Sequence, residues 1–354
     1  MNSRMWVVGS FVISLAAPLV AREKSDVIIL DNSDRLTGEI KSLKSGVLYV
    51  SLDYVDGTIA VQWSKVAGLK SKQLFIVRTQ DGNLLTGTLS GSTAPEPGPM
   101  MIEVAENAQH KVALEHSSII SLGETSQRFQ ERFSGEVEAS VVQSKGNDSV
   151  QYSIGSQVEY RRERWAIQTD VNSNLSSSSG STASSRNQIS LTGYHFLSSG
   201  NWFYAGVGNM LQSSTQKIAI LGNVGPGLGV FLKNTDRTRF SLLGGLVLQS
   251  TDYSVATFPA GTRRIAAGLV AADLSVFKFK KTNLNIRASF FPAISQPDRG
   301  RIYFDTNASY YLKIIGDLSW TLSFYGNWDT RPPAHLSGSD YGSSSGLSWT
   351  FGAR

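Results

Sequence analysis

The sequence predicts an all-β protein that ends in an antiparallel transmembrane β-barrel of about twelve strands. From Phe133 to Arg354, apolar and polar residues alternate in segments of about ten residues, as in strands with one lipid-facing side. The connections between these segments alternate between short turns and longer loops, and the last segment carries an aromatic motif. These features favour a membrane barrel over a secreted all-β sandwich, which requires neither the length alternation nor the motif.

Residues 1–21 are predicted to be a cleaved export signal. Arg4 supplies the positive charge, the following residues up to Val20 are mostly apolar, and Leu19–Ala21 fits a cleavage site. Pro18 interrupts the apolar segment, which favours a signal over a membrane anchor. The chain contains no cysteine, so disulfides, thiolate metal sites and a lipoprotein anchor are excluded.

Residues 22–127 are predicted to form a periplasmic domain of two repeats. Leu36–Ile40 (LTGEI) recurs as Leu85–Leu89 (LTGTL), and each copy contains short alternating segments bounded by turn residues. Because such short strands must hide their edges, we expect a pair of small SH3-like or Sm-like half-open barrels. Modules of this kind bind partners or act as spacers, so a periplasmic protein partner is expected.

Residues 128–354 are predicted to form the barrel. One face of residues 165–175 carries Trp165, Ile167, Val171 and Leu175. The short connections are expected around Arg162–Arg164, Ser198–Gly200, Lys233–Asp236, Lys280–Asn283 and Ile315–Asp317. The longer loops include Ser176–Ser185, Asp252–Thr262, Ala293–Gly300 and Thr330–Gly342. Bulges are expected at Pro226, which removes a ladder donor, and at Asp273, which interrupts the alternation of 265–277.

The C-terminal segment Ser344–Phe351 matches the assembly signal of terminal barrel strands. Its defining residues are Gly346, Trp349 and Phe351, although the chain continues to Arg354. We expect both aromatic residues to face lipid, and the barrel-assembly machinery and outer-membrane lipid to be partners. An interfacial girdle is expected from Trp165, Trp202, Phe203, Phe240, Tyr310, Trp320 and Trp328.

A family resemblance follows from these features. The stretch Asp26–Ile40 (DVIILDNSDRLTGEI), the export signal and the terminal barrel resemble salt-induced outer-membrane proteins of the YdiY type, a domain-of-unknown-function family. The resemblance covers most of the mature chain. It implies an outer-membrane location and transfers no catalytic residue.

The alternation also predicts which side chains line the lumen. The inward polar set is Glu138, Gln157, Asp170, Arg287, Asp305 and Asp329. Arg287 is expected to form a cross-strand ion pair with Asp305. The inward glycines are expected to be Gly206, Gly208, Gly225, Gly227, Gly229 and Gly245. This set favours a narrow, weakly cation-preferring passage, and the alternative is a polar interior closed by side chains and an inserted loop.

No catalytic, cofactor or metal site is predicted. The sequence contains no phosphate-loop, dinucleotide or zinc motif, and its four histidines lack metal-ligand spacing. His335 lies near Ser337, Ser339 and Asp340 in a long loop, which leaves an outer-membrane hydrolase as one alternative. The basic residues are scattered among turns, so nucleic-acid binding is not expected.

The expected function is that of an outer-membrane barrel, either a narrow channel or an envelope structural or stress-related protein with a periplasmic interaction domain. The alternatives are the hydrolase described above and a secreted all-β binding protein. The protein is not expected to be an enzyme or to carry a cofactor.

Overall fold

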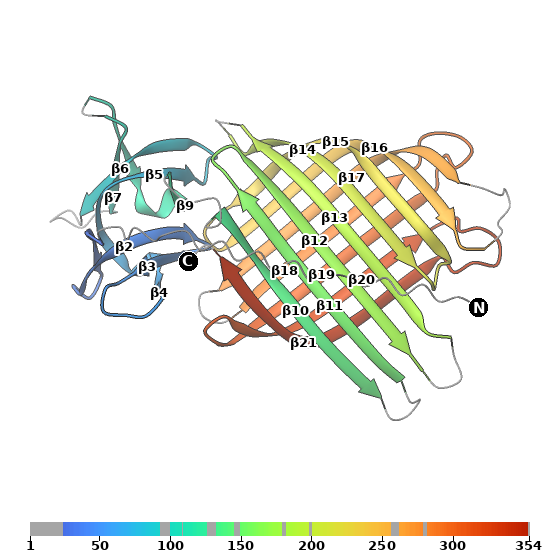
Figure 1. Cartoon of the computed structure of the whole chain (residues 1–354). Helices are drawn as coiled ribbons and strands as arrows, with labels where there is room; N and C mark the ends of the chain where they lie inside the picture. The colour runs from blue at the N-terminus through green and yellow to red at the C-terminus, as the bar shows by residue number, and fades with distance from the viewer. Residues whose placement is uncertain are drawn as a thin grey trace, which may run out of the picture.

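The computed structural model describes residues 24–92, 100–107, 109–125, 132–144, 149–178, 182–197, 200–255, 262–278 and 282–352. The predicted export signal, the boundary near residue 127, the last two residues and parts of several predicted connections lie outside these ranges. The chain forms a small N-terminal β-unit and a long barrel of strongly tilted strands (Figure 1). Among the described residues, no helix is long and apolar enough to cross a membrane.

The N-terminal unit is one nine-stranded sheet with the order β4-β3-β2-β1-β5-β6-β7-β8, while β9 pairs with both β2 and β5. Its strands are β1 (Asp26–Leu30), β2 (Arg35–Lys44), β3 (Val47–Ser51), β4 (Thr58–Gln62), β5 (Val66–Thr79), β6 (Leu84–Ser92), β7 (Met101–Ala105), β8 (Lys111–Glu115) and β9 (Ile119–Glu124). A single 3₁₀ turn follows β4 as η1 (Trp63–Lys65) and follows β8 as η2 (His116–Ser118).

The two sequence repeats share this sheet and one hydrophobic core. Strand β5 belongs to both repeats, because its first half pairs with β1 (Ile28 opposite Leu69) and its second half pairs with β9 (Val77 opposite Leu122). These four residues are buried in a single apolar cluster. The repeats are therefore joined through a common strand rather than packed as two separate units.

The C-terminal part is a closed antiparallel barrel of twelve strands. The strands are β10 (Phe133–Ser144), β11 (Ser149–Arg161), β12 (Trp165–Ser177), β13 (Ser184–Phe196), β14 (Trp202–Ser213), β15 (Ile218–Asn234), β16 (Thr238–Tyr253), β17 (Arg263–Lys278), β18 (Thr282–Pro292), β19 (Ile302–Ile315), β20 (Leu318–Asp329) and β21 (Ser339–Gly352). Pairing of β10 with β21, from Ser134↔Gly352 to Ser140↔Gly346, closes the barrel. The predicted closed barrel of about twelve strands is confirmed.

Side chains along the barrel strands alternate between an apolar outer face and an inner face, as a membrane barrel requires. On β13, Ile189 and Leu191 are exposed on the outside, whereas Gln188 and Thr192 are buried on the inside. Closure leaves no unpaired strand edge, and the outer face carries large apolar side chains around the barrel. These are the two conditions for a β-structure to lie in lipid.

Three sequence-based predictions about single positions are wrong. The β14–β15 register runs through Pro226 (opposite Gly206) without a shift, because the missing ladder pairs fall on the β16 side, where pairing resumes at Gly227 in the same register. Asp273 pairs with Ser241 in an uninterrupted β16–β17 register and needs no bulge, because its side chain simply continues the inward face. Phe203 is 1% exposed and packs inside the barrel, so it is not part of an outer girdle.

The N-terminal unit contacts the end of the barrel where β10 begins and β21 ends (Figure 1). The described connections at this end are short, as at 162–164, 235–237 and 316–317, whereas 293–301 and 330–338 lie at the other end. Lys44 Nζ donates to Ser134 Oγ (2.9 Å), and Asn201 Nδ2 donates to the Gln80 carbonyl (2.7 Å). We call these two ends of the barrel the short-turn end and the long-loop end.

Candidate functional site

The interior of the barrel contains a cavity of about 920 Å³. Its wall combines inward side chains of the barrel with residues from β2, β5 and β9 of the N-terminal unit. The cavity is therefore built by both parts of the chain, and the N-terminal unit forms its wall at the short-turn end. Its size is suitable for a small molecule.

Five of the predicted lumen residues line this cavity: Glu138, Gln157, Asp170, Arg287 and Asp305. Glu138 accepts hydrogen bonds from Thr321 Oγ1 (3.2 Å) and Ser323 Oγ (3.0 Å). The sixth predicted residue, Asp329, lies at the long-loop end and binds Arg301. The structure thus gathers five of the six residues around one space and places the other at its outer end.

Arg287 connects opposite walls of the barrel. Its Nη1 lies 2.9 Å from Asp170 Oδ2 on β12, and its Nε lies 2.5 Å from Asp273 Oδ1 on β17. Strands β12 and β18 lie on opposite sides in the closed strand order, so the first contact crosses the lumen. The predicted Arg287–Asp305 pair is wrong because the β18–β19 register places Asn307, not Asp305, opposite Arg287.

A second set of polar contacts crosses the lumen nearer the long-loop end. Arg186 on β13 donates from Nε to Asn327 Oδ1 on β20 (2.9 Å), and Gln188 Nε2 donates to Asp305 Oδ2 on β19 (3.1 Å). Ser213 Oγ on β14 donates to Asp340 Oδ2 on β21 (2.6 Å). Arg186 is only 2% exposed. These contacts form a polar layer that crosses the lumen.

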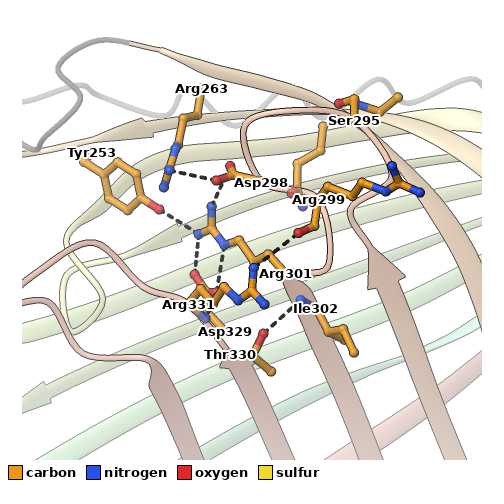
Figure 2. Close-up of polar contacts among 12 residues, drawn as sticks. Tyr253, Arg263, Ser295, Asp298, Arg299, Arg301, Ile302, Asp329, Thr330 and Arg331 are labelled. Carbon is orange, nitrogen blue, oxygen red and sulfur yellow. Dashed lines mark hydrogen bonds and ion pairs between the residues drawn. The ribbon is translucent and has the colours of Figure 1, made fainter.

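The connection Ala293–Arg301, which we call the lid, lies at the long-loop end of the barrel, near this layer. Arg301 binds three groups at once: Asp329 (Nε to Oδ1, 2.8 Å), Asp298 (3.2 Å) and Tyr253 Oη (2.9 Å). Arg263 on β17 also pairs with Asp298 (2.7 Å). Figure 2 shows Arg301 between Tyr253 of β16, Asp329 of β20 and Asp298 of the lid itself. The lid is thus held to the neighbouring strands β16, β17 and β20.

One side of the barrel interior is apolar. A buried cluster on β13 to β19 includes Phe196, Phe203, Leu243, Leu269, Ala271, Phe291 and Tyr303. The space beside Gly227 and Gly229 is filled by Leu243 and Phe203, so these inward glycines do not widen the lumen. Gly206 and Gly208 share the outward face of Tyr204 and Met210, so their predicted inward orientation is wrong. The lumen therefore has an apolar wall facing a polar one.

Four basic residues, which we call the basic vestibule, lie where the N-terminal unit meets the barrel: Lys44, Arg78, Arg161 and Arg239. The Arg78 guanidinium lies 4.4 Å from the Phe196 ring centre, and that of Arg161 lies 5.0 Å from the same centre. Burial, together with the positive charges of Arg161 and Arg239, lowers the pKa of Arg78. Sequence reasoning missed this group because its members come from both parts of the chain.

The predicted assembly residues lie on the closing strand. Trp349 is 54% exposed on the outer face and stacks on Phe351, with ring centres 5.9 Å apart. Gly346 pairs with Ser140 in the β10–β21 seam. The loop residues considered for a hydrolase are not assembled around one point, since His335 is exposed whereas Asp340 is buried and accepts from Ser213. Within the described ranges, no cluster of His, Asp or Glu side chains is arranged to hold a metal ion.

Sequence reasoning also missed Arg186 and the lid residues Asp298 and Arg301. Arg186 shares the inward parity of Gln188 on β13, so alternation alone could have identified it. Asp298 and Arg301 fall in or next to a predicted loop, where alternation carries no information about direction. The signal available in the sequence was a pair of opposite charges, Asp298 and Arg301, close to Pro297.

Comparison with solved structures gives weak similarities. The chain resembles the translocator domain of the autotransporter NalP from Neisseria meningitidis (13% identity, 61% of this chain and 87% of that chain, TM-score 0.33). It also resembles a porin (10% identity, 62% and 99%, TM-score 0.30) and CdiB from Acinetobacter baumannii (8% identity, 78% and 66%, TM-score 0.35). The barrel assignment rests on the strand ladder, not on these similarities.

Comparison with curated proteins finds no match to the chain. Comparison with family models does find one. The family model for the protein of unknown function DUF481 matches residues 137–351, which is more than half of the chain and includes nearly the whole barrel. The chain therefore belongs to the DUF481 family.

Proposed function

We propose that this protein is an outer-membrane β-barrel whose lumen is a gated passage, closed in the present conformation by the lid and the polar layer. The observation that carries the proposal is the series of contacts between opposite strands, in which Arg186 and Arg287 are the central donors. A twelve-stranded barrel is wide enough that side chains must reach across it to close it. Closure here depends on polar contacts, which can be exchanged for water when a passage opens.

The architecture supports the outer-membrane location. The outer face is apolar, the strand number is even, and the start of β10 and the end of β21 lie beside the N-terminal unit. Bacterial outer-membrane barrels place their short turns in the periplasm, so the N-terminal unit would be periplasmic. The resemblance to salt-induced outer-membrane proteins of the YdiY type adds an envelope stress role to this proposal.

The N-terminal unit would act as a periplasmic partner domain. Each repeat forms an antiparallel meander, then a 3₁₀ turn, then a strand that returns to the first strand of its repeat. This order supports the proposal that the repeats are related to small SH3-like or Sm-like barrels. Its contacts with the short-turn end would let a periplasmic partner influence access to the cavity.

Solute uptake into liposomes tests the gated passage. Liposomes with the full-length protein should take up small sugars slowly, and Arg301→Gln combined with Asp298→Asn should raise the rate about tenfold or more, because these changes remove the charges that hold the lid. Arg299→Gln is the matched control, since it makes the same change at an exposed lid residue. Heat-dependent migration in SDS would verify that each variant is folded. Equal uptake by the lid variant and the control would contradict the proposal.

A further inference from the structure

Most cations of the basic vestibule have no ion-pair partner among the described residues. Of its four cations, only Arg161 forms an ion pair among the described residues, with Glu159 at 3.0 Å. Among the other carboxylates that line the cavity, Glu136 accepts a hydrogen bond from Tyr311 Oη (2.6 Å). Arg78 is 7% exposed, and the hydrogen bond described for its guanidinium is to the Glu163 carbonyl at 3.2 Å. Arg78 is therefore a buried cation without an ion-pair partner in the described part of the chain, which is costly unless an anion joins it, whereas Lys44 is exposed.

An apolar surface begins directly beside these cations. Arg78 and Arg161 lie over the face of Phe196, and Arg239 lies 5.6 Å from the ring centre of Phe231. Stacking fixes the plane of a guanidinium and leaves its N–H edge available to an anion. From Arg239 the inward face of β16 continues to Leu243, which lies opposite Ala271. Phe196, Phe231, Leu243 and Ala271 all line the cavity.

We propose that this part of the cavity binds an amphiphilic anion, with a carboxylate or phosphate head in the basic vestibule and an aliphatic tail along the wall formed by Phe231, Leu243 and Ala271. A guanidinium binds a carboxylate or phosphate through paired N–H donors, which neutral solutes do not exploit. A small inorganic anion would satisfy the cations but leave the adjoining apolar wall uncovered. A head with a tail fills both surfaces of one continuous space.

The proposed ligand site lies in the same cavity as the proposed passage and rests on that proposal for the cavity alone, not for the gating. A ligand could reside in the vestibule whether or not the lid opens. Absence of ligand binding together with lid-dependent uptake would overturn this inference alone. Ligand binding together with lid-independent uptake would overturn the gated passage alone.

Isothermal titration calorimetry on the full-length protein in lipid nanodiscs tests the inference, with empty nanodiscs as the blank. The probes are octanoate and octyl phosphate, their cationic counterpart octylammonium, and the heads alone as acetate and inorganic phosphate. Octanoate and octyl phosphate should bind, octylammonium should not, and the heads alone should bind at least about tenfold more weakly. Equal binding of octanoate and octylammonium, or of octanoate and acetate, would overturn the assignment.

Variants locate the two halves of the site. Arg239→Gln should weaken octanoate binding about tenfold or more, because it removes a charged donor. Leu243→Ser should weaken octanoate binding to a similar degree while leaving acetate binding unchanged. Arg35→Gln removes the same charge at an exposed position of the N-terminal unit and should have no effect. If Arg239→Gln fails to fold, octanoate binding is measured instead with Arg78→Gln, which removes a vestibule cation of the N-terminal unit. Unchanged octanoate affinity in the folded variants would refute the site.

Discussion

At the scale of single residues, Arg186 illustrates how a charge is accommodated inside the lumen. Its guanidinium is buried against Gln188, Asn327 and Asp305, and it stacks on Tyr325 at 4.4 Å from the ring centre. Asp305 is itself buried and accepts from Gln188 and Asn327. Each member of the group therefore depends on partners from another strand.

We predict that Arg186→Met lowers the free energy of unfolding by about 3 kcal/mol, because Asp305 is left as a buried charge without its cation. Adding Asp305→Asn should recover much of this loss. Arg237→Met, at an exposed position, should change stability by less than about 0.5 kcal/mol. Urea unfolding in detergent measures the unmodified protein, Arg186→Met, Asp305→Asn, their combination and Arg237→Met. Additive effects of the two lumen substitutions would show that the pair is not coupled.

In the N-terminal unit, the environment of His116 also affects the stability of the fold. It stacks on Trp63 with ring centres 4.1 Å apart, at the equivalent position of the other repeat. Burial lowers its pKa from the ordinary value of 6.5. The folded form therefore keeps His116 neutral in a pH range where the unfolded chain has already bound a proton.

It follows that the N-terminal unit should lose stability as the pH falls from about 7.5 to about 5.5, since the unfolded state binds more protons in this range. His116→Phe keeps an aromatic ring against Trp63 and should flatten this pH dependence. His110→Phe, at an exposed histidine, should leave it intact. Urea titrations of the full-length protein at several pH values measure the effect. An unaltered pH dependence in His116→Phe would disprove the assignment.

The alternation predicts whether a side chain faces the lumen or the lipid, but it does not predict which side chains it contacts. Glu138, Asp170 and Arg287 line the cavity because inward parity follows directly from the period of a strand. The partner of Arg287 was not predictable, because Asp170 reaches it from the opposite wall. Such contacts depend on the width and tilt of the barrel, which no local pattern contains.

At the scale of secondary-structure elements, β21 closes the barrel and carries the predicted assembly motif. Trp349 and Phe351 lie on its outer face, where both lipid and the assembly machinery could contact them. The motif could be found from sequence because aromatic spacing on one strand is a local property. The lid could not, since a loop has no regular alternation and its position depends on Arg301 and partners from other strands.

Changing Trp349 and Phe351 together to Ser should strongly reduce the amount of protein in the membrane fraction, because the signal for insertion is lost. A matched control changes Trp202 and Tyr204 to Ser, which removes two exposed aromatic residues from the outer face of β14. Immunoblots of membrane and periplasmic fractions compare the two variants. Similar losses in both would indicate that apolar area, not the terminal motif, determines insertion.

At the scale of the whole molecule, the N-terminal unit and the barrel enclose one cavity. The sequence identifies both parts, because the repeat and the strand alternation are internal to each. It contains no local sign that Lys44 and Arg78 meet Arg161 and Arg239 across the junction. A cavity formed between two parts of a chain becomes visible only when their contacts are known.

Planar-bilayer recording of the purified full-length protein tests the central claim, that the lumen is closed by the lid and the polar layer. The unmodified protein should show no steady conductance, because Arg186 and Arg287 bridge opposite strands and ion pairs hold the lid at the long-loop end. The variant combining Arg301→Gln with Asp298→Asn should show discrete openings under the same voltage. A steady, ohmic conductance from the unmodified protein, or a variant as silent as the unmodified protein, would contradict this account.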